Sequence, residues 1–206
     1  MAKKRLRNHT NPLNFRQSLT DMAHLVPMVN GVDAFKQLDL EIGFGRGKFM
    51  RQYVMRHPDR FVVGVEVRKQ IVELFKEKPQ LPNLLPVWGT GAICLTDMIP
   101  DASLSRVFIF HPDPWFKARH AKRRVLNADL LALLHKKMRV DGRVYVSTDV
   151  ELLYNEMAEV CHACPLFERI DSDDFWTTDY QTHWSMFSEQ DQRSQWMITL
   201  KYKEST

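Results

Sequence analysis

The chain has 206 residues, of which 44% are hydrophobic and 26% are charged, and its formal net charge is +4. These values are typical of one soluble globular domain with a substantial core. No apolar run approaches the length of a membrane span and no signal-peptide pattern opens the chain, which argues against membrane contact or export. We therefore expect a cytoplasmic protein.

The positive charge is concentrated in two places. Segment 3–7 carries four basic residues with no acid nearby, whereas the other 201 residues balance 25 basic against 25 acidic side chains. A second basic stretch spans 117–124, with five positive charges in eight residues. Two separate basic patches favour a polyanionic partner, and an ordinary solvated surface is the alternative.

The cysteines give little sign of a disulfide or of a metal site. Their number, three, is odd and low, which argues against a disulfide framework. Cys161 and Cys164, in CHAC, have the spacing of metal ligands, but no second cysteine pair completes a four-ligand site. We expect no metal, with Cys161 facing the core from a helix.

Residues 1–30 have weak periodicity and are predicted to form a basic N-terminal arm, followed by one domain over 31–206. Within that domain, strands and helices alternate, which predicts an α/β fold with a mostly parallel sheet. Strands are expected at 37–45, 61–67, 83–89, 105–111, 143–148, 166–170 and 195–202. Helices are expected at 48–58, 69–78, 92–98 and 127–142, and after Asp149.

Single residues refine these predictions. Pro86 makes 83–89 a poor central strand. Asn127 is placed to cap the fourth helix and Gly142 to follow its end. One face of the first helix is predicted to hold Phe49, Met50, Tyr53 and Val54. The inward face of the fourth helix is predicted to hold Leu130, Leu131, Leu133 and Leu134. The fifth helix is predicted to contain Leu152, Leu153, Met157 and Val160.

A glycine-rich turn joins the first strand to the first helix. It reads Glu41-Ile-Gly43-Phe-Gly45-Arg-Gly47, and its spacing fits neither the dinucleotide fingerprint nor a phosphate loop. Glu66 ends the second strand, where a carboxylate can accept both hydrogen bonds of a ribose diol. Glu41, the glycines and Glu66 together predict an S-adenosylmethionine site, with a plain strand-to-helix turn as the alternative.

Asp113 lies between Pro112 and Pro114, directly after the fourth strand. The two prolines fix their own φ angles and restrict the residues before them, so Asp113 is predicted to be held rigidly. Ligands bind at the carboxyl ends of strands in such sheets, which places Asp113 where substrate meets cofactor. A stiff loop whose Asp caps a turn is the alternative.

The chain resembles the tRNA (guanine-N7-)-methyltransferases from about residue 5 to residue 202. The resemblance rests on LEIGFGRGKF, VGVEV, HPDPWFKARHAKRR and VYVSTD, with RNHTNPL near the start. It implies a Rossmann-like class I methyltransferase fold, with a mostly parallel seven-stranded sheet and helices on both faces. It also implies methyl transfer from S-adenosylmethionine to N7 of a guanine in the variable loop of tRNA. We expect a monomer or a homodimer.

The resemblance also implies roles for single residues. Thr90, in Gly-Thr-Gly, occupies the position where the family usually has an Asp near the adenine, and Asp113 lies in the reaction site. By the same resemblance, the cofactor is held by Glu41, Gly43, Gly45 and Glu66. The residues that meet tRNA are Lys117, Arg119, His120, Lys122, Arg123 and Arg124. The guanine pocket is lined by Asp149, Thr182 and Ser185.

Two departures from the family pattern concern the site. His111 stands where an aromatic residue usually precedes Pro-Asp-Pro-Trp. Ser185 stands where the family has the Glu of Thr-x-x-Glu, and Glu189, one helical turn further on, is a candidate substitute. Two alternatives to the active enzyme therefore stay open. One is a degenerate relative that binds tRNA without methylating it, and the other is a methyltransferase with a different substrate.

Overall fold

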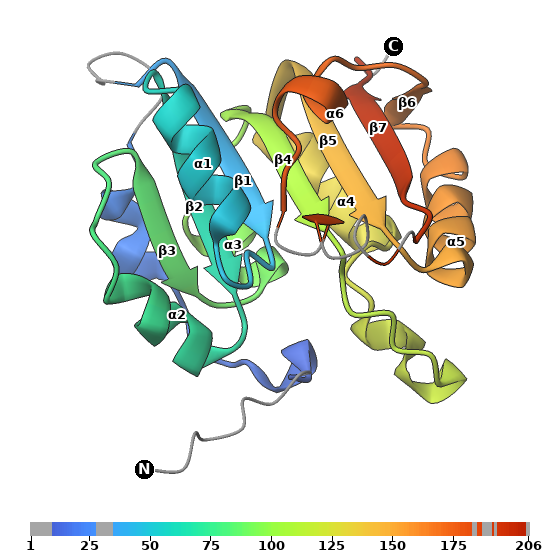
Figure 1. The fold of residues 1–206 in the computed structure, drawn as a ribbon, viewed down its shortest axis with the longest axis horizontal. Coiled ribbons are helices and arrows are strands. Elements are labelled where there is room, and N and C mark those ends of the chain that lie inside the picture. Colours follow the sequence, from blue (N-terminus) through green and yellow to red (C-terminus); the bar gives the residue numbers. More distant parts are fainter. Residues whose placement is uncertain (1–9, 28–34, 183–184, 187–190, 192, 205–206) are drawn as a thin grey trace.

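The computed structural model describes residues 10–27, 35–182, 185–186, 191 and 193–204. Within this part of the chain, seven strands form one sheet in the order β3-β2-β1-β4-β5-β7-β6 (Figure 1). The strands from β3 to β5 in this order are parallel, and β7 runs antiparallel to both of its neighbours. The predicted seven-stranded, mostly parallel sheet is confirmed.

The elements follow one another in the predicted alternation. The strands are β1 (Gln37–Ile42), β2 (Arg60–Glu66), β3 (Leu84–Trp88), β4 (Leu104–Phe110), β5 (Met138–Thr148), β6 (Phe167–Ile170) and β7 (Trp196–Tyr202). The helices are α1 (Lys48–Arg56), α2 (Lys69–Lys76), α3 (Gly91–Asp97), α4 (Ala128–Lys137), α5 (Glu151–His162) and α6 (Phe175–Thr178). Three short 3-10 helices are η1 (Pro12–Asn14), η2 (Thr20–Leu25) and η3 (Ala118–Arg123).

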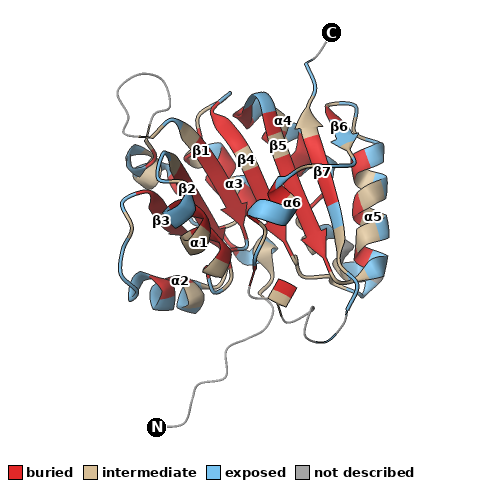
Figure 2. Cartoon of the chain, turned by 45° about the horizontal axis from the view of Figure 1, so that its top comes forward, coloured by how far each residue is buried: buried red, intermediate tan, exposed pale blue. Residues whose placement is uncertain are grey.

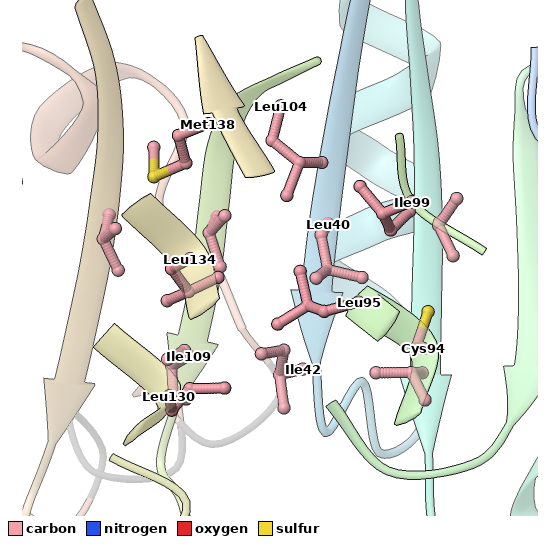
Figure 3. Packing of buried hydrophobic residues seen from close by; sticks show 14 of the residues in the cluster. Leu40, Ile42, Cys94, Leu95, Ile99, Leu104, Ile109, Leu130, Leu134 and Met138 are labelled. Atoms are coloured by element: carbon pink, nitrogen blue, oxygen red, sulfur yellow. The ribbon is translucent and has the colours of Figure 1, made fainter. Parts of the chain in front are cut away.

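The central strands are buried on both faces, as their continuous apolar runs require (Figure 2). One face packs against α3, α4 and α5, and the other against α1, α2 and α6. Figure 3 shows the first of these layers, in which Leu40 and Ile109 of the sheet meet Leu95 of α3 and Leu134 of α4. Cys161 is buried in the same layer, as predicted.

Two local predictions are confirmed. The β3 strand lies at the edge of the sheet, where the missing N–H of Pro86 costs no ladder hydrogen bond on its open side. The side chain of Asn127 caps α4 by accepting a hydrogen bond from the N–H of Leu130 at 2.9 Å.

Two predictions for α4 are wrong in detail, and α5 buries only some of its apolar residues. The α4 helix ends at Lys137 rather than near Gly142, because Met138 pairs with Leu104 of β4 and the following residues join β5. Leu133 is only half-buried. In α5 the buried face consists of Leu153, Met157 and Cys161, spaced four residues apart, so Leu152 faces solvent and is 57% exposed.

Residues 10–27 pack against the body of the domain. Phe15 and Leu19 are buried, and the ring of Phe15 meets Trp88 edge-on at 5.1 Å between centroids. The carboxylate of Asp97 accepts hydrogen bonds from the Ser18 hydroxyl and from the N–H of Leu19. The basic residues of segment 3–7 lie outside the described residues. No described helix is long and apolar enough to cross a membrane.

Candidate functional site

A cavity of about 470 Å³ opens at the carboxyl ends of the parallel strands. Its walls come from Gly43 after β1, Glu66 to Arg68 after β2, Gly89 to Ala92 after β3, and Phe110 to Asp113 after β4. Residues of the basic segment, of α4 and of η1 complete it. Its volume lies in the usual range for small-molecule sites. The cavity therefore brings together turns that the sequence predicted to meet.

The glycine turn approaches the cavity without side chains. Gly43, Gly45 and Gly47 all have positive φ angles, which glycine adopts at low cost. A Cβ atom added to Gly43 would meet nothing within 4 Å, so the turn leaves open space where a ligand can lie against the backbone. Gly47 instead packs on α2, since a Cβ atom there would lie 2.2 Å from the ring of Phe75.

Both oxygens of the Glu66 carboxylate are already engaged. Oε1 accepts hydrogen bonds from Nε and the backbone N–H of Arg68, at 2.9 and 3.0 Å. Oε2 accepts from Nη2 of Arg68 at 2.7 Å and from the N–H of Gly45 at 3.1 Å. The hydrogen bond and charge of Glu66 raise the pKa of Arg68, and the charge of Asp113 adds to this. Arg68 thus takes the two acceptors that a ribose diol would need.

Glu41 is buried beside the cavity but is not part of its wall. Its carboxylate accepts a hydrogen bond from the backbone N–H of Met50, and Oε2 is buried without a hydrogen-bond partner among the described residues. Burial, and to a lesser extent the charge of Glu66, raise the pKa of Glu41 from 4.5 to about 8. The neutral carboxyl is therefore the favoured form at pH 7.

The raised pKa of Glu41 predicts a pH dependence of stability. Between pH 4.5 and about 8 the folded chain holds a proton that the unfolded chain has lost, so stability falls as pH rises through this window. Glu41→Gln keeps the shape and cannot ionise. We expect the free energy of unfolding of the variant to lack this part of the decline with pH. At pH 9 it should exceed that of the parent by more than about 1 kcal/mol. Denaturant unfolding at pH 5, 7 and 9 measures it, and identical pH slopes would contradict the assignment.

Thr90 lies at the start of α3, in the wall of the cavity. Its hydroxyl accepts a hydrogen bond from the N–H of Ile93 at 3.3 Å and so caps the helix. The position where the family usually has an Asp is thus filled here by a capping residue without charge.

Asp113 lines the same cavity as Glu66, and its charge acts on Arg68, the partner of Glu66. The loop that carries it contains two strained residues, since His111 and Trp115 have φ angles of 47° and 43°. Positive φ angles in bulky residues persist only where the surrounding structure enforces them. The predicted rigid placement of Asp113 therefore has a physical basis in its two prolines and in these two residues.

Asp149 lies behind this loop rather than in the wall of the cavity. One carboxylate oxygen is 3.5 Å from Nδ1 of His111 and the other is 3.4 Å from Arg193. Nε2 of His111 contacts the hydroxyl of Tyr180 at 2.9 Å, and this hydroxyl also contacts Ser147 at 2.8 Å. Burial lowers the pKa of His111 although the charge of Asp149 opposes the shift. The unusual His111 thus links Asp149 to Tyr180.

Ser185 and Thr182 form a closed turn. The Ser185 hydroxyl accepts a hydrogen bond from the N–H of Thr182 at 2.9 Å, and the Thr182 hydroxyl accepts one from the N–H of Ser185 at 2.7 Å. Both residues are buried, and neither is in the wall of the cavity. Glu189 lies outside the described residues.

The basic segment divides into exposed and anchored residues. The exposed cations of η3 are Arg119 and Lys122, together with Lys117 directly before it, and η3 projects from the sheet edge at the lower right of Figure 1. His120 is half-buried on the same turn. Arg123 lies over the ring of Trp115 at 4.9 Å, and Arg124 pairs with Glu156 of α5 and donates to the carbonyl of Pro114. Arg124 therefore fastens the segment to the body.

Comparison with known proteins identifies the family. Residues 36–203 match a family described as a putative methyltransferase. The tRNA (guanine-N(7)-)-methyltransferase of Microcystis aeruginosa is 37% identical over 179 residues, which cover 82% of each chain. The chain belongs to the tRNA (guanine-N7-)-methyltransferase family. The enzyme of the same name from Thermosynechococcus vestitus is 34% identical, over 71% of this chain and 70% of its own length.

Solved structures place this tRNA (guanine-N7-)-methyltransferase family member among methyltransferase folds. The 16S rRNA methyltransferase KamB superposes with a TM-score of 0.58 at 17% identity, covering 83% of this chain and 90% of KamB. An S-adenosylmethionine-dependent methyltransferase from Listeria monocytogenes, described as putative, gives 0.52 at 11% identity, covering 90% and 98%. At these identities the likeness concerns the fold, and it confirms the expected Rossmann-like class.

The sequence of this tRNA (guanine-N7-)-methyltransferase family member did not point to Arg68 or Tyr180, which the structure places at the site. Arg68 follows Glu66 by two residues, so the Glu-x-Arg spacing is a signal that would have found it. Tyr180 contacts His111 from far along the chain and carries no local signal. No group of three metal-binding side chains occurs within the described residues.

Proposed function

We propose that this chain transfers a methyl group from S-adenosylmethionine to N7 of a guanine in tRNA, in the variable loop. One observation supports the proposal most strongly. Asp113, held between two prolines, shares a cavity with Glu66 and the glycine turn, and the exposed cations of η3 follow it directly in the chain. In this proposal Glu66 accepts hydrogen bonds from the nucleoside, Asp113 recognises the base, and the cations of η3 contact phosphates, all at one sheet edge.

The wall of the cavity suits S-adenosylmethionine. Gly43 leaves room against its backbone, and Glu66 presents two carboxylate oxygens to a ribose diol once Arg68 withdraws. Thr90 and Gly89 offer a wall without charge for the adenine. The buried carboxyl of Glu41, with one oxygen that has no hydrogen-bond partner among the described residues, offers a polar group rather than a full charge near a cationic ligand. Bound there, S-adenosylmethionine supplies an electrophilic methyl group on a sulfonium.

In the proposed reaction the protein does not need to remove a proton from the base. Guanine N7 carries an in-plane lone pair and no proton, so transfer requires alignment rather than a general base. The carboxylate of Asp113 accepts hydrogen bonds from N1–H and the exocyclic amine of guanine, which orients the base. A nearby negative charge also stabilises the positive charge that the ring gains as the N7–methyl bond forms.

Asp149 has a supporting role in this proposal. Its carboxylate is held between His111 and Arg193, and His111 lies in the wall of the cavity beside Asp113. The charge of Asp149 therefore orients the His111 ring from behind, and the ring bounds the space left for guanine. Thr182 and Ser185 shape the segment that carries Tyr180 and Gln195, whose side chains meet at 3.3 Å.

Transfer of labelled methyl from S-adenosylmethionine to an unmodified tRNA transcript tests the proposal. We expect about one methyl group per transcript, recovered as 7-methylguanosine after digestion to nucleosides. Tight tRNA binding without transfer would instead indicate the degenerate relative. Transfer to another RNA, with tRNA inert, would indicate a different substrate. The Ser185 hydroxyl is already hydrogen-bonded to the backbone of Thr182, so the turn does not need the carboxylate that the family usually has at this position. We therefore expect the parent chain to be active. We place the reaction in the cytoplasm.

A further inference from the structure

Two cations lie on one aromatic ring beside the glycine turn. The guanidinium carbon of Arg51 is 5.8 Å from the ring centre of Phe75, and Nζ of Lys78 is 5.0 Å from it. Backbone carbonyls hold both side chains in place. Nη1 of Arg51 donates to the carbonyl of Pro79 at 2.7 Å, and Nζ of Lys78 donates to the carbonyl of Arg46 at 2.9 Å. The two charges are therefore pre-positioned rather than spread over mobile side chains.

No described carboxylate pairs with either cation. Glu73, the acid within α2, faces Lys69 at 3.8 Å instead. Partial desolvation lowers the pKa of Lys78, and the positive charges of Arg51 and Arg46 lower it further. Arg51 and Lys78 repel one another on the shared ring, and an anion that binds both relieves the repulsion.

This cation pair shares its sheet edge with the site. Arg46 belongs to the glycine turn, and the ring of Phe75 that carries both cations packs directly under Gly47. In Figure 1, α2 lies at the lower left and η3 at the lower right, with the carboxyl ends of the strands between them. The two basic surfaces therefore flank the cavity. A nucleic acid whose target base enters the cavity has backbone phosphates on both sides of that base.

We propose that Arg51 and Lys78 form a second phosphate-binding surface, which contacts the backbone of the same tRNA on the far side of the cavity from η3. The inference rests on the proposed function for the identity of the RNA. Phosphate is the fitting partner because both side chains are cationic, fixed and exposed or half-buried around a buried ring. Two anchors would hold the target nucleotide between them, whereas η3 alone leaves the RNA free to pivot.

Salt-dependent binding of a tRNA transcript, measured by fluorescence anisotropy from 50 to 300 mM KCl, tests this surface. Arg51→Ala with Lys78→Ala should reduce the slope of log affinity against log salt by about 1.8, or 0.9 for each lost contact. The matched control, Lys36→Ala with Arg139→Ala, removes the same charge from exposed positions at the opposite edge of the sheet and should leave the slope unchanged. Replacing Lys117, Arg119 and Lys122 by Ala is the positive comparison.

Two further readouts separate this inference from the proposed function. In methyl transfer, the Arg51 and Lys78 double variant should show a severalfold higher KM for tRNA with kcat unchanged, and its affinity for S-adenosylmethionine by calorimetry should match the parent. Arg51→Lys with Lys78→Arg keeps the charge and should retain the parental slope. A parent that binds tRNA without methylating it defeats the proposed function alone. A double variant with the parental slope, or a control pair with an equal loss, overturns the second surface.

Discussion

Asp113→Asn is expected to lower kcat/KM for methyl transfer by at least about a hundredfold, which corresponds to roughly 2.7 kcal/mol of transition-state stabilisation. Asn fits the same loop between Pro112 and Pro114, so the fold should persist. The amide replaces one acceptor with a donor that opposes the donors of guanine, and it removes the charge that stabilises the methylated ring. Methyl transfer to a tRNA transcript at concentrations well below KM, with the cofactor saturating, measures the loss in kcat/KM.

Asp149→Asn is the matched control for this prediction. Asp149 acts through His111 from behind the loop, so its loss of charge should cost less than that of Asp113. Affinity for tRNA should be close to the parental value in both variants, because the exposed cations of η3 are untouched. If Asp113→Asn transfers methyl within a few-fold of the parent, or if Asp149→Asn is the more damaging change, the assignment of Asp113 is wrong.

Glu66→Gln is expected to weaken S-adenosylmethionine binding by about tenfold to a hundredfold, equivalent to about 1–3 kcal/mol for the lost charge-assisted hydrogen bonds. The carboxylate presents two acceptors, and the amide presents one. Arg68 also loses its partner and is left facing the charge of Asp113. Isothermal titration calorimetry of the parent and the variant measures the change without requiring turnover.

Arg68→Ala discriminates between two explanations of such a loss. Arg68 occupies both oxygens of Glu66, so it competes with a ribose diol for the same acceptors. Its removal should leave S-adenosylmethionine affinity equal to or above that of the parent. If Arg68→Ala weakens binding as much as Glu66→Gln does, the ion pair itself maintains the site and Glu66 is not the ribose acceptor.

Local sequence patterns were sufficient for most of the fold. Continuous apolar runs predicted the buried parallel strands, and Pro86 predicted an edge position for β3. The end of α4 was missed because Met138 and Val140 are compatible with a helix, and only pairing with β4 draws this segment into the sheet. The partner strand is distant in the chain, so no local pattern carries this information.

For the site, too, local sequence patterns predicted some features and missed others. Glu66 and Asp113 end their strands, so their presence at one sheet edge followed from the alternation of elements. Their surroundings did not. The pairing of Arg124 with Glu156, which anchors the basic segment, depends on how α5 packs beside the loop. Sequence reasoning treated Arg124 as one more phosphate contact, and the structure gives it a partner in the protein.

The most direct test of the central claim uses a tRNA transcript in which every guanosine is replaced by 7-deazaguanosine. This substitution exchanges N7 for a C–H group and leaves the phosphates and the Watson–Crick edge of the base intact. Binding affinity and its salt slope should therefore match those of the ordinary transcript, whereas labelled methyl should enter only the ordinary one. Methyl transfer to the 7-deaza transcript at the ordinary rate would contradict the claim that N7 of guanine is the acceptor.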